Sequence, residues 1–129
     1  MAEKVTAAVR TAPQTTEIRE YDMPDIADEA ALLKVEVAGI CGTDVKFYSK
    51  PPFEGPCIMG HENIGYIAKA GKTFMQRRGL KEGDLVFAEH YVGCMNCEHC
   101  HRGDYRLCMF TDWRRFPDGL RFGYTLAER

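Results

Sequence analysis

Apolar and polar positions alternate along five segments of the chain, and these segments are rich in residues that favour strands. They are KVTAAVR at 4–10, ALLKVEVAGI at 31–40, NIGYIAKAG at 63–71, DLVFAEHYV at 84–92 and FGYTLAE at 122–128. Breakers such as Pro51-Pro52 and Gly83-Asp84 lie between them and indicate turns. The pattern predicts a mainly β fold, mostly antiparallel.

Helical periodicity is scarce in comparison. The best candidate runs from Thr43 to Tyr48, where Thr43 or Gly42 is able to cap the first turn. A second short turn is predicted within Cys97 to Arg102. We therefore expect one or two short helices, with the chemistry carried by loops between strands.

Length and charge narrow the class of protein. A chain of 129 residues fits one domain with a modest core. Its net charge of -2, with no run of one sign, gives no reason to expect nucleic acid or a membrane surface as a partner. No segment approaches the length that crosses a bilayer, so we expect a cytoplasmic location. Thiols stay reduced there, so the six cysteines point to metal binding or catalysis before disulfides.

Four of these cysteines lie close together, and they are Cys94, Cys97, Cys100 and Cys108. Their spacing of two, two and seven intervening residues suits Zn²⁺, which binds four thiolates in a tetrahedron. Such a shell is complete, so the pattern predicts a structural zinc site that replaces an apolar core. Disulfides, an iron–sulfur cluster and free thiols are the alternatives, and ferredoxin-type clusters use similar spacing.

A second candidate site comprises Cys41 in GICGTD and the pair His61-Glu62 in GHENIG. Each stretch lies where a predicted strand ends or begins, so the two could meet. A thiolate and an imidazole suit a second zinc whose coordination stays open, as catalysis requires. Taken alone, such a pair is more often composed of core or surface residues.

The order of four motifs carries a family resemblance. GICGTD, GHENIG-x5-G, KEGDLV and C-x2-C-x2-C-x7-C follow one another over nearly the whole chain. Together they resemble the zinc-containing medium-chain alcohol dehydrogenase family, and the Cys-Gly-Thr-Asp form is most similar to its polyol and threonine dehydrogenase branch. The resemblance implies a GroES-like, partly open β-barrel over residues 1–129, with short helices and a structural zinc lobe at about 90–112.

The resemblance also implies roles for single residues. Cys41 and His61 match the first two catalytic zinc ligands, and Glu62 matches the adjacent carboxylate that joins the metal shell in some members. Thr43 matches the hydroxyl that takes the proton from the bound alcohol. Asp44 matches the carboxylate that orients the histidine. Cys57 is expected to be a partly buried thiol, and His90, His99 and His101 are expected to be surface imidazoles.

The implied reaction is oxidation of an alcohol or polyol with hydride transfer to NAD or NADP. The sequence contains no G-x-G-x-x-G fingerprint, so the family's Rossmann domain is absent from this chain and the cofactor would be bound outside it. We therefore expect the isolated chain to be inactive, and the full-length form to be a homo-oligomer.

Two other functions remain open from the sequence. One is a stand-alone zinc-stabilised binding or protein-interaction module without catalysis. The other is nucleic-acid binding by arginines and aromatics around Trp113, Phe116 and Phe122, which interleaved aspartates dilute. The same stretch, WRRFPDGLRFGYT, is otherwise expected to form cleft wall and subunit surface.

Overall fold

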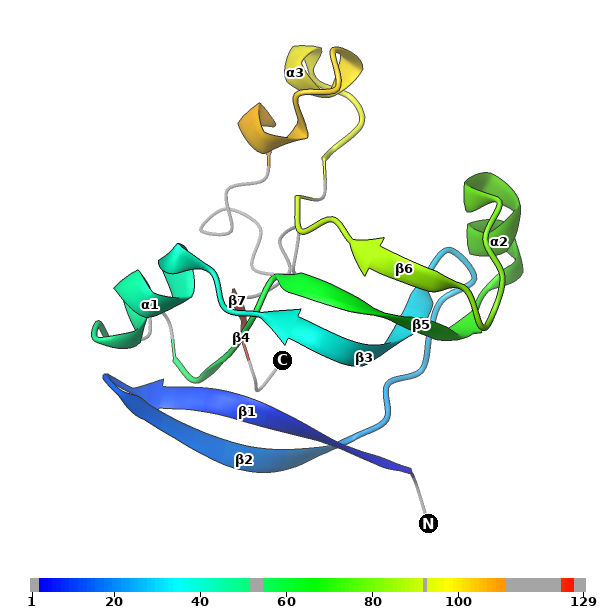
Figure 1. Cartoon of the computed structure of the whole chain (residues 1–129). Coiled ribbons are helices and arrows are strands. Elements are labelled where there is room, and N and C mark those ends of the chain that lie inside the picture. The colour runs from blue at the N-terminus through cyan, green and yellow to red at the C-terminus, as the bar shows by residue number, and fades with distance from the viewer. Residues whose placement is uncertain (1–2, 52–54, 92, 111–123, 127–129) are drawn as a thin grey trace.

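The fold is described from a computed structural model, which defines residues 3–51, 55–91, 93–110 and 124–126. Its strands form two antiparallel sheets (Figure 1). The first sheet has the order β2-β1-β4-β7, and the second has the order β3-β5-β6. The strands are β1 (Lys4–Ala12), β2 (Thr15–Asp22), β3 (Ala31–Gly39), β4 (Cys57–Met59), β5 (Glu62–Ala70), β6 (Leu85–Ala88) and β7 (Tyr124–Leu126).

Within the described residues, three short helices and one 3-10 turn join these strands. They are α1 (Gly42–Tyr48), α2 (Lys72–Arg78), α3 (Glu98–His101) and the 3-10 turn Tyr105–Leu107. The predicted mainly β, antiparallel fold is therefore confirmed. Helix α1 begins one residue earlier than predicted, with Cys41 and not Gly42 or Thr43 at its N-cap. The stretch around Trp113 and Phe116 lies outside the described residues.

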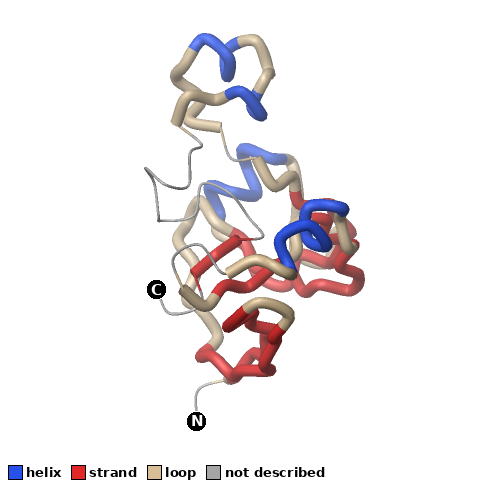
Figure 2. The backbone as a smooth tube through the Cα atoms, turned by 90° about the vertical axis from the view of Figure 1, so that its left-hand side faces the viewer, coloured by secondary structure: helices blue, strands red, loops and turns tan. Residues whose placement is uncertain are grey.

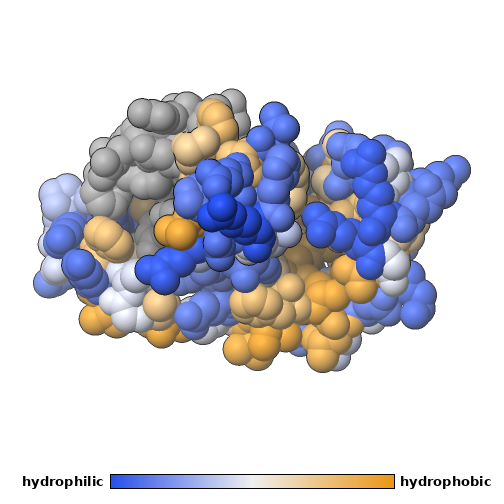
Figure 3. Space-filling model, turned by 90° about the horizontal axis from the view of Figure 1, so that it is seen from above, coloured by the Kyte–Doolittle hydropathy of each residue, from blue (hydrophilic) through white to orange (hydrophobic). Residues whose placement is uncertain are grey.

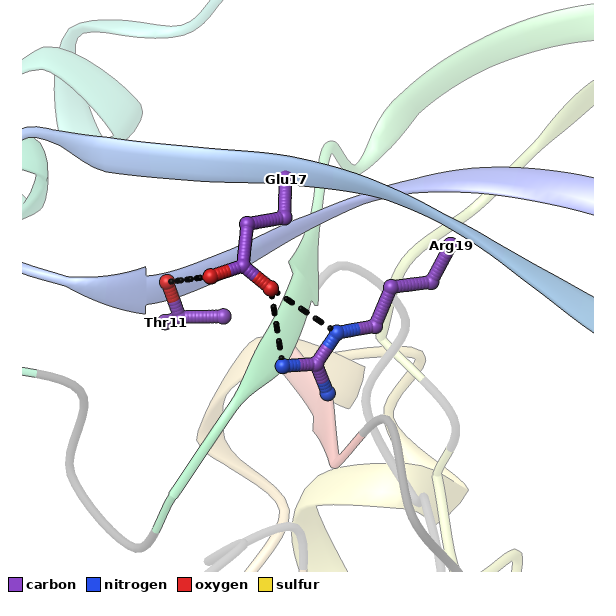
Figure 4. Close-up of polar contacts among 3 residues, drawn as sticks. All are labelled: Thr11, Glu17 and Arg19. Carbon is purple, nitrogen blue, oxygen red and sulfur yellow. Dashed lines mark hydrogen bonds and ion pairs between the residues drawn. The ribbon is translucent and has the colours of Figure 1, made fainter.

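Strand β2 was not predicted, and polar contacts along it show how it pairs. It forms a hairpin with β1 in which Val9 faces Glu17 and Ala7 faces Arg19. The Glu17 carboxylate accepts hydrogen bonds from the Thr11 hydroxyl at 3.2 Å and from two guanidinium nitrogens of Arg19 at 3.2 and 3.0 Å (Figure 4). The Thr11–Glu17 bond crosses the hairpin next to its turn, whereas the Glu17–Arg19 contact lies along β2. All of them are exposed and contribute little stability.

Helix α2 was also not predicted, and a residue far away in the sequence fixes its start. The Asp28 carboxylate accepts hydrogen bonds from the backbone nitrogen of Lys72 at 2.9 Å and from the Thr73 hydroxyl. The Asp28 carbonyl accepts another from the backbone nitrogen of Phe74 at 3.0 Å. Gly79 ends the helix with φ +64°, a left-handed conformation that glycine adopts without strain.

The buried core of the described part of the chain is small. Val9 is its one large side chain that is fully buried, and Cys57 and Ile67 are buried nearby in the two sheets. The second sheet leaves large apolar side chains exposed, and Figure 3 shows hydrophobic surface gathered along one side of the molecule. These side chains are Val35, Val37, Ile64, Tyr66, Leu85 and Phe87. An apolar face of this kind is typical of a surface that packs against another structure.

Residues 93–110 form a lobe that projects away from both sheets (Figures 1 and 2). It contains α3 and the 3-10 turn, and its buried cluster consists of cysteines only. No helix in the described part of the chain is long and apolar enough to cross a membrane.

Candidate metal centres

The four lobe cysteines converge as their spacing predicts. Cys97 caps α3, Cys100 lies within it, Cys108 follows the 3-10 turn, and Cys94 comes from the loop before. Their sulfur atoms all lie within 4.8 Å of one another. The Cys94–Cys100 and Cys97–Cys108 pairs are each separated by 3.9 Å. A tetrahedron with Zn–S bonds of about 2.3 Å has edges of about 3.8 Å, so the donor set fits zinc.

The same distances exclude disulfides in this conformation, since a bonded pair would have its sulfurs about 2.05 Å apart. All six cysteines of the chain are free thiols. Cys57 belongs to neither donor group and is buried in β4, with 6% of its surface exposed. We expected a partly buried thiol at this position, and the structure shows a buried one, because β4 lies between β1 and β7 in the first sheet.

Backbone amides surround the lobe sulfurs and favour their ionised form. The backbone nitrogens of Cys94 and Phe110 each donate to Cys108 Sγ at 3.4 Å. Amides of Cys100 and Met109 lower the pKa of the Cys97 thiol to about 6. Burial raises the pKa of the Cys100 thiol to about 12. Proximity of the sulfurs thus concentrates negative charge that a divalent cation would neutralise.

Glycine is required at the entrance of the lobe. A Cβ at Gly93 would lie 2.8 Å from a ring carbon of Tyr105 and 2.9 Å from Cys100 Sγ. At the far end, Gly103 has φ +82°, which closes the turn after α3. The backbone is therefore shaped around the sulfur cluster.

The second donor group forms where β3 ends and β5 begins. The β3–β5 register places Gly39 opposite Glu62, which brings Cys41 next to His61. Ligand atoms of Cys41, His61 and Glu62 lie within 4.8 Å of one another. His61 is buried, with 6% of its surface exposed, whereas Glu62 is exposed. The predicted meeting of these residues at adjacent strand ends is confirmed as geometry.

Asp44 connects the two halves of this group. Its Oδ2 atom accepts a hydrogen bond from the backbone nitrogen of Cys41 at 2.8 Å, and its Oδ1 atom lies 3.8 Å from His61 Nδ1. Thr43 precedes it in the first turn of α1 and is exposed. All five residues that the resemblance implied at the catalytic site therefore come from adjacent segments of the fold.

Sequence reasoning missed His90, which follows β6. Its ring centroid lies 4.9 Å from that of His61, with 43° between the ring planes. The expectation that His90 is a surface imidazole is therefore wrong, because its side chain is only 23% exposed and contacts a residue of the donor group. The β5–β6 register pairs Asn63 with Ala88 and brings the two histidines together. The signal available in the sequence was the pair of predicted strands at 63–71 and 84–92, because their antiparallel pairing places His90 beside His61.

A pocket of about 420 Å³ lies behind this site, between α1 and the first sheet. Ile40 and Met59, which are close to Cys41 and His61 in sequence, line it together with Asp44 and Arg10. Arg10 is 3% exposed and donates a hydrogen bond to the Phe47 carbonyl near the end of α1. The guanidinium thereby joins β1 to the helix that carries Asp44.

Fold and donor groups together define an antiparallel β domain with two groups of side chains that could each hold a metal ion. The model of the alcohol dehydrogenase GroES-like domain matches residues 27–128. The chain therefore belongs to this family, and its mainly β fold is GroES-like.

Known proteins agree with this membership. The chain is 40% identical over 106 residues to a probable alcohol dehydrogenase of Mycobacterium tuberculosis, covering 81% of this chain and 29% of that protein. It is 33% identical over 117 residues to an L-threonine 3-dehydrogenase of Pyrococcus furiosus, covering 86% and 33%. A solved oxidoreductase/dehydrogenase of unknown specificity from Escherichia coli matches with a TM-score of 0.75 and 30% identity, covering 97% and 36%. The chain thus spans about a third of the length of these relatives.

Proposed function

We propose that this chain is the zinc-binding catalytic-domain portion of an NAD(P)-dependent alcohol or polyol dehydrogenase. The observation that carries the proposal is the convergence of Cys41, His61 and Glu62 at the edge of the second sheet. The relatives named as dehydrogenases support it. The alternative is a zinc-stabilised binding module, which would need the four-thiol lobe but not the second donor group.

The lobe would hold a structural zinc through Cys94, Cys97, Cys100 and Cys108. Four thiolates complete a tetrahedral shell, so no position is left for a substrate. Its role is to order residues 93–110, where the sulfurs are the buried core of the described residues.

The second group would hold a catalytic zinc through Cys41, His61 and Glu62. Three protein donors leave one tetrahedral position for a substrate. Zinc bound there would supply Lewis acidity that makes an alcohol hydroxyl more acidic. The thiolate and the carboxylate would offset the charge of the ion.

Two residues of α1 would assist the reaction. Asp44 orients the donor group, because its carboxylate holds the Cys41 backbone and faces Nδ1 of His61. The Thr43 hydroxyl would take the proton that the alcohol loses and pass it to solvent, to which this residue is exposed.

Hydride acceptance would require NAD or NADP. The 129 residues contain no glycine fingerprint for a dinucleotide, so we propose that the cofactor is bound by a domain other than this one. The exposed apolar side chains of the second sheet support packing against further polypeptide, including a homo-oligomer. Reduced thiols at both donor groups support a cytoplasmic location.

Metal stoichiometry combined with substrate binding tests the proposal. The chain should bind two zinc ions, and Cys41→Ser and Cys94→Ser should each remove one of them. With cobalt at the second site, adding a simple alcohol, a polyol or a hydroxy amino acid should shift the visible spectrum of at least one sample. A single ion per chain, or a second site whose spectrum none of the three changes, would favour the binding module.

A further inference from the structure

His90 and Glu89 lie directly beside the second donor group, although neither belongs to it. The His90 ring is tilted by 43° against the His61 ring at a centroid distance of 4.9 Å. Aromatic rings in contact have centroids about 4.5–7 Å apart, so the two imidazoles touch. The Tyr91 ring packs against His90 at 3.9 Å. His90 is therefore enclosed between Tyr91 and His61.

The carboxylate of Glu89 lies beside the His90 ring and is placed to orient it. Its Oε1 atom lies 3.1 Å from His90 Nδ1, within hydrogen-bond distance. An imidazole that donates through Nδ1 to a carboxylate is held in one tautomer and one ring orientation. Because the donor and the carboxylate are neighbours in the chain, the pair depends on local backbone geometry after β6.

Asp44 also lies beside the His61 ring, since its Oδ1 atom is 3.8 Å from His61 Nδ1. The His90 ring contacts His61 from a different segment, the one that follows β6. This contact restricts the His61 ring, because a tilted neighbour blocks rotation of its plane.

We propose that Glu89 and His90 form a positioning pair for His61, holding its imidazole in the plane from which it meets a metal together with Cys41 and Glu62. The inference rests on the proposed function of these three residues as a metal site. His90 acts through His61 and is a positioning residue. Partners that orient a metal-ligating histidine contribute about 10–100-fold to metal affinity.

Cobalt titration of the purified chain tests the pair, because the two sites give different spectra. The wild type should bind two ions, the tighter one with the intense sulfur charge-transfer absorption of a four-thiolate site. Substitution His90→Ala should weaken the other ion about 10–100-fold and broaden its visible bands, while the four-thiolate absorption stays unchanged. His90→Phe preserves an aromatic face and should lose less than about tenfold.

Three further variants sharpen the result. Glu89→Gln keeps the size of the side chain and should shift the bands of the weaker ion in the same direction as His90→Ala. His90→Leu keeps most of the volume and replaces His90→Ala if that variant alters the circular dichroism spectrum. His101→Ala is the matched control, since it removes an exposed imidazole from α3.

The outcomes separate the inference from the proposed function. If the wild type binds one ion, at the four-thiolate site only, the second site and with it the proposed function fail. If the wild type binds two ions and His90→Leu retains the affinity and spectrum of the second, the positioning pair is overturned while the site stands. A loss in His90→Leu that His90→Phe restores supports the contact between the two rings. A spectral shift of the weaker ion in Glu89→Gln supports the role of Glu89 in the pair, and an unchanged spectrum in that variant overturns it.

Discussion

Replacing Cys108 by serine tests whether sulfur–metal bonds hold the lobe together. Cys108 lies 3.9 Å from Cys97 and accepts backbone hydrogen bonds from Cys94 and Phe110, so it ties both ends of the lobe to its centre. The larger apolar side chains offer little compensation, since Leu107 and Met109 are each 57% exposed. We expect Cys108→Ser to weaken zinc binding and to unfold residues 93–110 locally.

The size of the effect follows from the number of donors. Structural zinc sites contribute about 10–16 kcal/mol of apparent binding free energy. Shared among four thiolates, this amounts to about 2.5–4 kcal/mol for each, or roughly a 100- to 1000-fold loss of zinc affinity when one is removed. Both sheets should keep their structure, because the lobe projects away from them (Figures 1 and 2).

Chelator competition and hydrogen exchange measure the two parts of this prediction. Zinc released to a chromogenic chelator gives the affinity of the lobe. Exchange of the Gly103 and Leu107 amides, which donate within the lobe, reports its local order. The Ile67 amide, which donates to the Asp84 carbonyl, reports the second sheet.

Cys57→Ser is the matched control, because Cys57 is equally buried but lies outside both donor groups. It should leave zinc affinity unchanged at the lobe. Slow exchange of the lobe amides in metal-free Cys108→Ser would show that packing, and not the metal, orders residues 93–110. The account of the lobe as a sulfur-centred core would then be refuted.

Three further substitutions and one control substitution test the scaffold. Asp44→Asn should weaken the second metal about 10–100-fold without affecting the first, as measured by cobalt titration. Gly65→Ala should destabilise the fold by about 1–3 kcal/mol in urea unfolding, because the added Cβ would lie 2.1 Å from a carbonyl oxygen of β3. Gly42→Ala is the control, since a Cβ there meets nothing within 4 Å and should change the stability by less than about 1 kcal/mol. The hydrogen bond from the Thr73 hydroxyl lowers the pKa of Asp28 below 3.8 in the folded chain. The ionised Asp28 carboxylate therefore stabilises the fold above pH 3.8, and this stabilisation is lost as the pH falls through the pKa of the folded state. In Asp28→Asn the melting temperature should depend less on pH in this range.

The donor groups were predictable because their signals are local. Residues separated by two positions reach one ion from a single turn, so Cys94, Cys97 and Cys100 needed no tertiary information. Predicting that Cys41 and His61 meet required tertiary information as well, namely that two antiparallel strands bring the end of one next to the start of the other. The sequence supplied that information through the alternation of 31–40 and 63–71, and the β3–β5 register agrees with it.

Two elements whose own sequence carries no clear pattern were not predicted, helix α2 and strand β2. Helix α2 has the sequence KTFMQRR, in which Phe74 and Met75 are adjacent and no apolar stripe appears. Its first turn is stabilised by Asp28, which lies 44 residues before Lys72. Strand β2 is mostly exposed, so it lacks the apolar face by which a strand is recognised. Helix α2 thus depends on a partner far away in the chain, whereas β2 depends on its hairpin pairing with the preceding strand β1.

The missed His90 shows why a site is better located by strand ends than by motifs. The end of β3, the start of β5 and the end of β6 lie at one edge of the second sheet, and they carry Cys41, His61 and the Glu89-His90 pair in that order. A motif search finds the first two, because spacing and residue type mark them as ligands. The pair after β6 has no motif of its own, and only the register of Asn63 with Ala88 places it there. When two strands of a sheet carry metal ligands at one end, polar residues at the same end of the next strand are therefore candidates for orienting those ligands, even where no ligand motif marks them.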